Sequence, residues 1–211
     1  VYGIEKDSIL LGNGAAELLY AVGRLSGFTG AFVPAPGFSE YQASMDAANI
    51  PVREIFYRQR QNDDGTPYFE VPYLALQTFA AELKGQDGRI IVFLGNPNNP
   101  DGTLFDKQSI KVLAQMLKDA NSLLVIDESF IDFIGNESLR DNSHSMRELI
   151  NQYDNVIIVH SFTKFYAVPG LRIGAVFANP TLIQELRQYI PAWSVNTLAQ
   201  AYTESALTDT K

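Results

Sequence analysis

One short stretch, residues 161–174 (SFTKFYAVPGLRIG), places several reactive side chains directly after an apolar strand pattern. Ser161 and Thr163 provide hydroxyl groups, Lys164 provides an amine, and Arg172 provides a guanidinium group. A lysine amine can bond covalently to a carbonyl carbon, and the planar fork of an arginine can bond two phosphate oxygens at once. The stretch therefore favours a site in which the amine reacts while its neighbours hold a phosphate.

Two other expected strand ends lead into helices in ways that suit ligand binding. Residues 12–19 read GNGAAELL, so a glycine-rich turn precedes a helix that begins at Ala15 and Ala16. Such a turn can hold a phosphate with its free N–H groups and the helix dipole, or it can be a tight turn without a ligand. Phe38 stands at a second strand-to-helix junction. Its ring can stack on a flat heterocycle, or it can pack as a hydrophobic staple.

Two polar residues follow further apolar runs. Asn99 lies in the turn GNPNNPDG, where its amide could meet a ligand oxygen or could serve turn chemistry alone. Asp127 ends the run LLVI, and a carboxylate in such a place is costly unless it is paired. A helix cap or a structural ion pair is the ordinary explanation. A fixed anion that holds a cationic ligand atom is the functional one.

These residues lie in a chain in which apolar runs alternate with amphipathic stretches. Runs that are apolar throughout, such as IIVFL and VIIV, are typical of strands covered on both faces. We expect strands at residues 8–11, 30–33, 52–57, 90–94, 123–126, 156–160 and 173–177. We expect helices at residues 15–26, 39–48, 72–84, 107–120, 144–151, 181–189 and 196–207. Residues 58–68 (RQRQNDDGTPY) are expected to form an exposed loop.

This alternation predicts an α/β fold, a three-layer α/β/α sandwich around a mostly parallel sheet. In such sheets ligands bind beyond the carboxyl ends of the strands, where the residues described above should meet.

Composition excludes several classes of function. The 211 residues, 46% of them hydrophobic, suffice for one well-buried core. Without cysteine there is neither a disulfide framework nor a thiolate metal site, and two distant histidines disfavour a histidine-based metal site, so no metal is expected. A net charge of −8 without a long basic cluster disfavours nucleic-acid and membrane partners. No signal peptide or membrane-spanning run is evident, so a cytoplasmic protein is expected.

Taken together, the residue types at the strand ends match the demands of pyridoxal 5′-phosphate (PLP). A lysine bonds to its aldehyde, and an aspartate keeps its ring nitrogen protonated so that the ring accepts electrons. An asparagine can bond the ring oxygen, an aromatic side chain can stack on the ring, and a glycine turn with hydroxyls and an arginine can hold the phosphate.

Over essentially its whole length the chain resembles the large domain of fold-type I PLP-dependent enzymes of aminotransferase class I/II. The motifs NPNNPDG, VIDESF and SFTKFYAVPGLRIG carry this resemblance. The chain resembles most the branch that contains histidinol-phosphate aminotransferases and L-threonine-O-3-phosphate decarboxylases. The stretches GNGAAE, PGFSEY, DESFIDF and PAWSVNTLA are similar to those of the decarboxylases.

The resemblance implies a role for each site residue. Lys164 is implied as the catalytic residue that bonds to the aldehyde, Asp127 as the partner of the ring nitrogen, and Asn99 as the partner of the ring oxygen. Phe38 is implied to stack on the ring. The implied phosphate ligands are the backbone of Ala15 and Ala16 and the side chains of Ser161, Thr163 and Arg172. Phe130 stands where aminotransferases usually carry a tyrosine, and this favours the decarboxylases.

The resemblance also implies an architecture. We expect a seven-stranded mixed sheet in which residues 172–177 form the one antiparallel strand, and a cis peptide bond between Asn99 and Pro100. Residues 1–211 are expected to be the PLP-binding large domain of a longer protein, without the N-terminal arm and the small C-terminal domain. A homodimer with its active site at the interface is implied.

Three functions are compatible with these observations. The first is decarboxylation of L-threonine O-3-phosphate, a phosphorylated amino acid, to an aminopropanol phosphate in cobalamin biosynthesis. The second is transamination of the histidinol-phosphate type. The third, from another class, is a non-catalytic PLP-binding module of a regulator.

Overall fold

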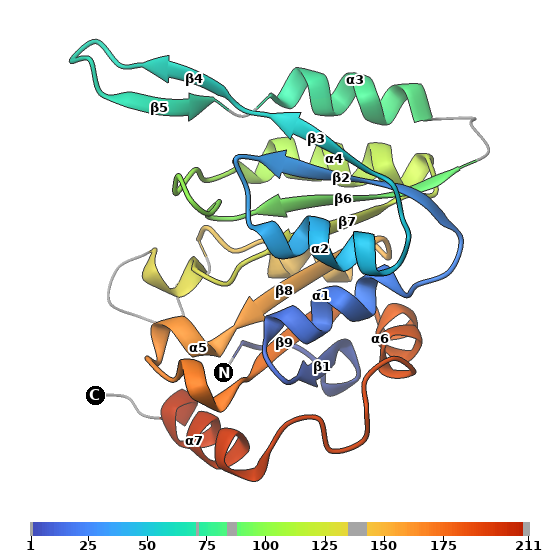
Figure 1. The fold of residues 1–211 in the computed structure, drawn as a ribbon, viewed down its shortest axis with the longest axis vertical. Coiled ribbons are helices and arrows are strands. Elements are labelled where there is room, and N and C mark those ends of the chain that lie inside the picture. Colours follow the sequence, from blue (N-terminus) through green and yellow to red (C-terminus); the bar gives the residue numbers. More distant parts are fainter. Residues whose placement is uncertain (1, 71, 84–87, 135–142, 209–211) are drawn as a thin grey trace.

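The computed structural model describes residues 2–70, 72–83, 88–134 and 143–208, which form a seven-stranded sheet covered by helices on both faces (Figure 1). The strand order is β1-β9-β8-β7-β6-β2-β3. The strands are β1 (Ile9–Gly12), β2 (Phe28–Ala35), β3 (Val52–Phe56), β6 (Arg89–Gly95), β7 (Leu123–Asp127), β8 (Val156–Ser161) and β9 (Gly174–Ala178). Within the described sheet, β9 is antiparallel to both of its neighbours, β1 and β8, and the other neighbouring strands are parallel. This confirms the expected mixed sheet with its antiparallel strand at that place.

Alternation along the strands divides the core between two faces. On β6, Ile91 and Phe93 pack on one face, whereas Val92 and Leu94 pack on the other. The first face is covered by α1 (Ala15–Gly23), α2 (Ser39–Ala47) and α6 (Pro180–Arg187). The second face is covered by α3 (Tyr73–Leu83), α4 (Lys107–Asp119) and part of α7 (Thr197–Thr208). This is the three-layer arrangement that the alternating sequence pattern predicts.

Local capping explains where two of these helices begin. At α4, Asp106 Oδ1 accepts a hydrogen bond of 2.9 Å from the backbone N–H of Ser109. At α6, Asn179 Oδ1 accepts one of 3.0 Å from Thr181, and Pro180 occupies the first helical position. Both caps satisfy backbone donors that a helix start leaves unpaired. The expected end of α3 at Lys84 lies outside the described residues.

The expectation of a plain loop at residues 58–68 is wrong. Strands β4 (Arg58–Gln61) and β5 (Pro67–Glu70) pair antiparallel as an exposed hairpin (Figure 1). Its turn contains Gly65 with φ +83°, and the backbone N–H of Thr66 donates to Asp64 Oδ1 at 2.9 Å. An Asp-Gly pair is a strong hairpin signal, which the polar composition of the stretch obscured.

The expected helix at residues 144–151 is also incorrect, because the chain forms only a 3-10 helix, Arg147–Asn151. The backbone N–H of Met146 and the hydroxyl of Ser145 both donate to the carboxylate of Glu128. Ser145 and Met146 are therefore held by hydrogen bonds to Glu128, directly after β7, and do not form a helical turn. The bond between Asn99 and Pro100 is cis, as expected, and those before Pro36 and Pro97 are cis as well.

A buried charge network lies beside the end of β7. Arg147 Nε lies 3.4 Å from Glu128 Oε2, and Arg147 Nη2 lies 3.5 Å from Asp132 Oδ1. The other carboxylate oxygen of Asp132 lies 3.1 Å from Nε2 of the fully buried His160. Desolvation raises the pKa of Glu128 and the Arg147 charge opposes that rise. The guanidinium of Arg147 is thus the cation that offsets two buried carboxylates.

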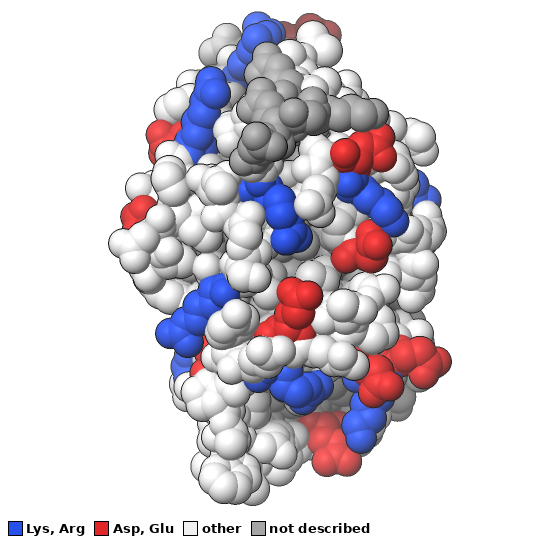
Figure 2. Space-filling view, turned by 90° about the vertical axis from the view of Figure 1, so that its right-hand side faces the viewer, with Lys and Arg blue, Asp and Glu red and all other residues white. Residues whose placement is uncertain are grey.

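Figure 2 shows the side of the molecule at which the parallel strands begin, where acidic and basic side chains are interspersed. Exposed ion pairs on the molecule include Lys118 with Asp154 at 2.9 Å and Lys111 with Glu148 at 3.3 Å. Among the residues that the structure describes, no helix has the length and apolar character needed to cross a membrane.

The buried charge network predicts that removing a buried cation lowers the free energy of unfolding more than removing an exposed one. We expect Arg147→Met to lower the free energy of unfolding by about 3–5 kcal/mol, because it leaves buried carboxylates without their cation. Lys118→Met also removes the cation of an ion pair, but an exposed one, and should cost no more than about 1 kcal/mol. Urea unfolding followed by circular dichroism measures both. Equal losses would show that burial of the pair has no energetic consequence.

Candidate active site

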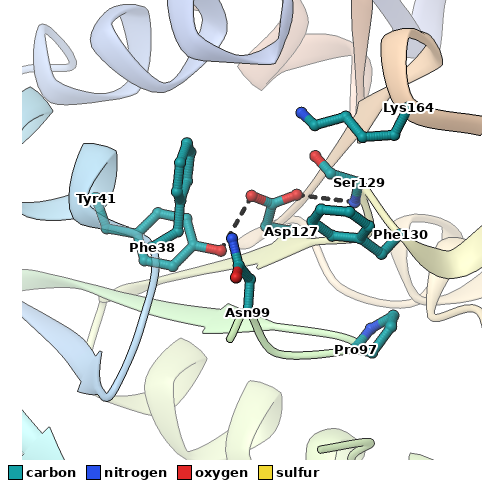
Figure 3. A pocket seen from close by; sticks show the side chains of 8 residues that line it. All are labelled: Phe38, Tyr41, Pro97, Asn99, Asp127, Ser129, Phe130 and Lys164. Carbon is teal, nitrogen blue, oxygen red and sulfur yellow. Dashed lines mark hydrogen bonds between the residues drawn. The ribbon is translucent and has the colours of Figure 1, made fainter. Parts of the chain in front are cut away.

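The parallel strands end at one edge of the sheet, and a pocket opens there. Its empty space, counting the part open to solvent, is about 320 Å³. Figure 3 shows its side chains converging from the segments that follow β2, β6, β7 and β8. The lining residues are Phe38, Tyr41, Pro97, Asn99, Asp127, Ser129, Phe130 and Lys164.

The carboxylate of Asp127, 6% exposed, is fixed by two donors at the floor of this pocket. The hydroxyl of Tyr41 donates to its Oδ2 at 3.0 Å, and the backbone N–H of Ser129 donates to its Oδ1 at 2.8 Å (Figure 3). Both donors are neutral groups. They orient the carboxylate and bring no positive charge of their own.

Aromatic rings form one wall of the pocket. Phe38 directly precedes α2 as its N-cap residue, and its ring meets that of Tyr41 edge to face with 5.7 Å between the ring centroids. The ring of Tyr41 stacks in turn on Phe93 of β6, with 5.3 Å between centroids. The wall is therefore anchored in the core, and Phe38 presents a half-buried ring to the cavity.

Lys164 enters the pocket from the opposite side, on the one-turn helix α5 (Phe162–Phe165) (Figure 3). The residue as a whole is exposed, yet its amine lies in part-buried surroundings, 3.4 Å from Ser161 Oγ and 5.7 Å from the ring centre of Phe130. Desolvation lowers the pKa of Lys164; the charge of Asp127 opposes this shift, and that of Arg172 adds to it. Because its pKa is lowered, a larger share of the Lys164 amine is neutral, and the neutral amine is the nucleophilic form.

A second feature adjoins the pocket where α1 begins. Gly14, at φ +85°, precedes α1, and no side chain caps the helix. A Cβ at Gly14 would lie 2.3 Å from Nη2 of Arg172, so the guanidinium lies against this turn. The N–H groups at Ala15 and Ala16 belong to the first turn of α1, at the positive end of its dipole. A guanidinium beside a free helix start makes an anion site.

Strand register connects this anion site to the amine. Ser161 of β8 pairs with Gly174 of β9, and a Cβ at Gly174 would lie 2.6 Å from the backbone nitrogen of Ala15. The hydroxyls of Ser161 and Thr163 lie 2.8 Å apart. Ser161 Oγ also receives the hydrogen bond from Lys164, so Ser161 contacts the amine while its strand partner Gly174 lies against the start of α1.

The structure brings the expected site residues together in two groups. Those that line the pocket are Phe38, Asn99, Asp127, Phe130 and Lys164. Those that adjoin it around the start of α1 are Ala15, Ala16, Ser161, Thr163 and Arg172. Their individual roles stay predictions.

Sequence reasoning assigned no role in the site to three lining residues: Tyr41, Pro97 and Ser129. A signal existed for Tyr41, which follows Phe38 by one helical turn and so lies on the same side of α2. Ser129 acts through its backbone N–H, which its residue type does not reveal. His160 is fully buried outside this pocket, with its Nε2 close to the hydroxyl of Tyr2 and to the carboxylate of Asp132.

The chain is similar to known proteins over almost its whole length. Residues 2–211 match the family Aminotransferase class I and II. The adenosylcobalamin biosynthesis bifunctional protein CobDQ of Leptospira interrogans is 35% identical over 211 residues, which cover 99% of this chain and 22% of that protein. The threonine-phosphate decarboxylase of Salmonella typhimurium is 32% identical over 207 residues, covering 95% of this chain and 50% of that protein.

Among solved structures, the histidinol-phosphate aminotransferase from Clostridium acetobutylicum superposes with a TM-score of 0.79 at 25% identity, over 97% of this chain and 56% of that one. The chain thus spans half the length or less of the two curated relatives. Because the family match extends over almost every residue, the chain belongs to the aminotransferase class I and II family.

Proposed function

We propose that the protein binds PLP in this pocket and is an enzyme that acts on the amino group and Cα of a phosphorylated substrate. The observation that carries the proposal is the placing of Lys164 and Asp127 in one cavity, with the anion site of Arg172 and α1 beside the amine. An amine, a fixed anion and an anion-binding turn are the three groups that this cofactor requires.

The residues present fit such a cofactor. The absence of a Cβ at Gly14 leaves room for Arg172, and Gly14 itself has no side chain that could cap α1 in place of a phosphate. Phe38 offers a ring face at the cavity wall, and Asn99 lines the same cavity with an amide. Asp127 retains a negative charge that can hold a protonated ring nitrogen, because both of its donors are neutral.

PLP, when bound, supplies an aldehyde that captures an amine and a protonated ring that accepts electrons from a bond breaking at Cα. The chain's own residues bind, orient and move a proton. Asp127 would hold the ring nitrogen, Phe38 would orient the ring plane, and Arg172 with the start of α1 would hold the phosphate. Lys164 Nζ would carry the proton that is returned to Cα.

For the reaction we propose decarboxylation of L-threonine O-3-phosphate, which yields carbon dioxide and an aminopropanol phosphate in cobalamin biosynthesis. Two observations support it. The curated relatives reported above include a threonine-phosphate decarboxylase and an adenosylcobalamin biosynthesis protein. Phe130 lines the pocket beside the amine of Lys164 without a hydroxyl that could donate to the ring oxygen.

A histidinol-phosphate type of transamination is the second candidate, favoured by the structural likeness to the aminotransferase from Clostridium acetobutylicum. A non-catalytic PLP-binding module of a regulator is the third. Under the first two candidates, residues 1–211 are the large domain of a longer cytoplasmic protein that pairs as a homodimer.

The covalent attachment gives the first test. In the full-length protein, PLP should produce an absorption band of bound cofactor that survives dialysis, because its aldehyde is tied to Lys164. Lys164→Ala should abolish the band, since it removes the amine. Lys111→Ala removes a surface lysine, paired with Glu148, and should leave the band unchanged. A persistent band in Lys164→Ala would place the attachment elsewhere.

The choice between reactions is tested by product analysis. Full-length protein given L-threonine O-3-phosphate should release carbon dioxide, because the pocket presents no aromatic hydroxyl at position 130. Given histidinol phosphate with 2-oxoglutarate, it should form little glutamate. The reverse pattern would support transamination. Bound PLP with neither product would support the regulatory module.

The amine's environment predicts opposite shifts for two charge changes. Arg172 lowers and Asp127 raises the pKa of Lys164, so the pH at which the amine becomes reactive should rise in Arg172→Gln and fall in Asp127→Asn. The pH dependence of the amine's reactivity is measured by its rate of reaction with pyridoxal. Because pyridoxal lacks the phosphate, its binding does not depend on the anion site. Shifts in the same direction in both variants would contradict the electrostatic explanation.

A further inference from the structure

Tyr41 is a buried tyrosine whose hydroxyl serves the pocket rather than the helix that carries it. It lies in the first turn of α2, is 2% exposed, and donates to Asp127 Oδ2 at 3.0 Å. A hydrogen bond to a charged acceptor is among the stronger ones in proteins. The bond joins α2 to the end of β7, two segments far apart in the chain.

The ring of Tyr41 has a second set of contacts. It stacks on Phe93 in the core and meets Phe38 edge to face, and its backbone N–H donates to the carbonyl oxygen of Phe38 at 3.2 Å. Tyr41 therefore contacts both the carboxylate at the pocket floor and the aromatic ring in the pocket wall.

We propose that Tyr41 is a positioning residue for the cofactor: its hydroxyl orients the Asp127 carboxylate and its ring orients Phe38, so that the two meet the cofactor ring at a fixed angle. The inference rests on the proposed function and adds to it a residue that acts through two others. Tyr41 needs no contact with the cofactor for this role.

The protonation state of Tyr41 suits the role. Burial, followed by the charge of Asp127, raises the pKa of its hydroxyl well above the ordinary value for tyrosine. The hydroxyl is therefore a neutral donor throughout the physiological range, and it leaves the carboxylate charge available to a cationic ring nitrogen.

The test compares two tyrosine-to-phenylalanine variants of the full-length protein. Tyr41→Phe removes the hydroxyl bonded to Asp127. Tyr57→Phe removes an equally buried hydroxyl that has no hydrogen-bond partner among the described residues, on the opposite face of the sheet. We expect Tyr41→Phe to weaken PLP binding about tenfold and Tyr57→Phe to change it less than twofold.

A purely structural role for Tyr41 is separated by spectroscopy. Induced circular dichroism per bound cofactor, measured at saturating PLP, reports how firmly the cofactor ring is oriented. It should decrease in Tyr41→Phe and match the wild type in Tyr57→Phe. A loss of folding stability alone would leave this signal per bound molecule unchanged, and that result would overturn the proposal.

The route through Asp127 is tested by a double-mutant cycle. In an Asp127→Asn background the acceptor is neutral, and such hydrogen bonds are roughly half as strong. Adding Tyr41→Phe should then weaken PLP binding only about threefold. Half of the free-energy change corresponds to the square root of the tenfold effect in the wild type. Fully additive effects would overturn the proposed route.

The outcomes also distinguish a failure of the proposed function from a failure of the proposed role of Tyr41. If the wild-type protein binds no PLP, the proposed function fails. If it binds PLP and Tyr41→Phe matches Tyr57→Phe in affinity and in circular dichroism, only the role of Tyr41 fails.

Discussion

The arrangement of the candidate site depends on one buried carboxylate. Removing an ionised side chain from water costs several kcal/mol unless hydrogen bonds replace the lost solvation. For Asp127 these bonds come from Tyr41 on α2 and from the backbone of Ser129. The requirement to satisfy this one charge therefore fixes the start of α2, with the ring of Phe38, against the end of β7.

The neighbouring carboxylate shows the alternative solution. Glu128 follows Asp127 directly and is fully buried, but its charge is offset by the guanidinium of Arg147. A carboxylate paired with a full positive charge contributes to structure and has little charge left for a ligand. Asp127, held by neutral donors, keeps its charge available. Adjacent residues thus divide between structure and site according to the charge of their partners.

The sequence predicted the sheet well because its strands are apolar throughout, and strand ends are where this fold collects ligand-binding residues. It failed where long-range contacts decide local structure. Ser145 and Met146 donate hydrogen bonds to Glu128 where a helix was expected. The local sequence around residues 144–151 gives no sign of these bonds, because Glu128 lies outside that stretch. Tyr41 was missed for the same reason, since its hydroxyl acts on a strand end 86 residues away in the chain.

The two halves of the site differ in how their geometry is specified. The amine of Lys164, the hydroxyls of Ser161 and Thr163 and the guanidinium of Arg172 come from one continuous stretch, and the pairing of Ser161 with Gly174 sets their spacing. The carboxylate and the aromatic wall come from separate segments that meet only in the folded core. Loss of core packing should therefore misplace Asp127 and Phe38 before it changes the spacing of Ser161, Thr163 and Lys164. This makes the ring-binding half of the pocket the part most sensitive to mutations in the sheet interior.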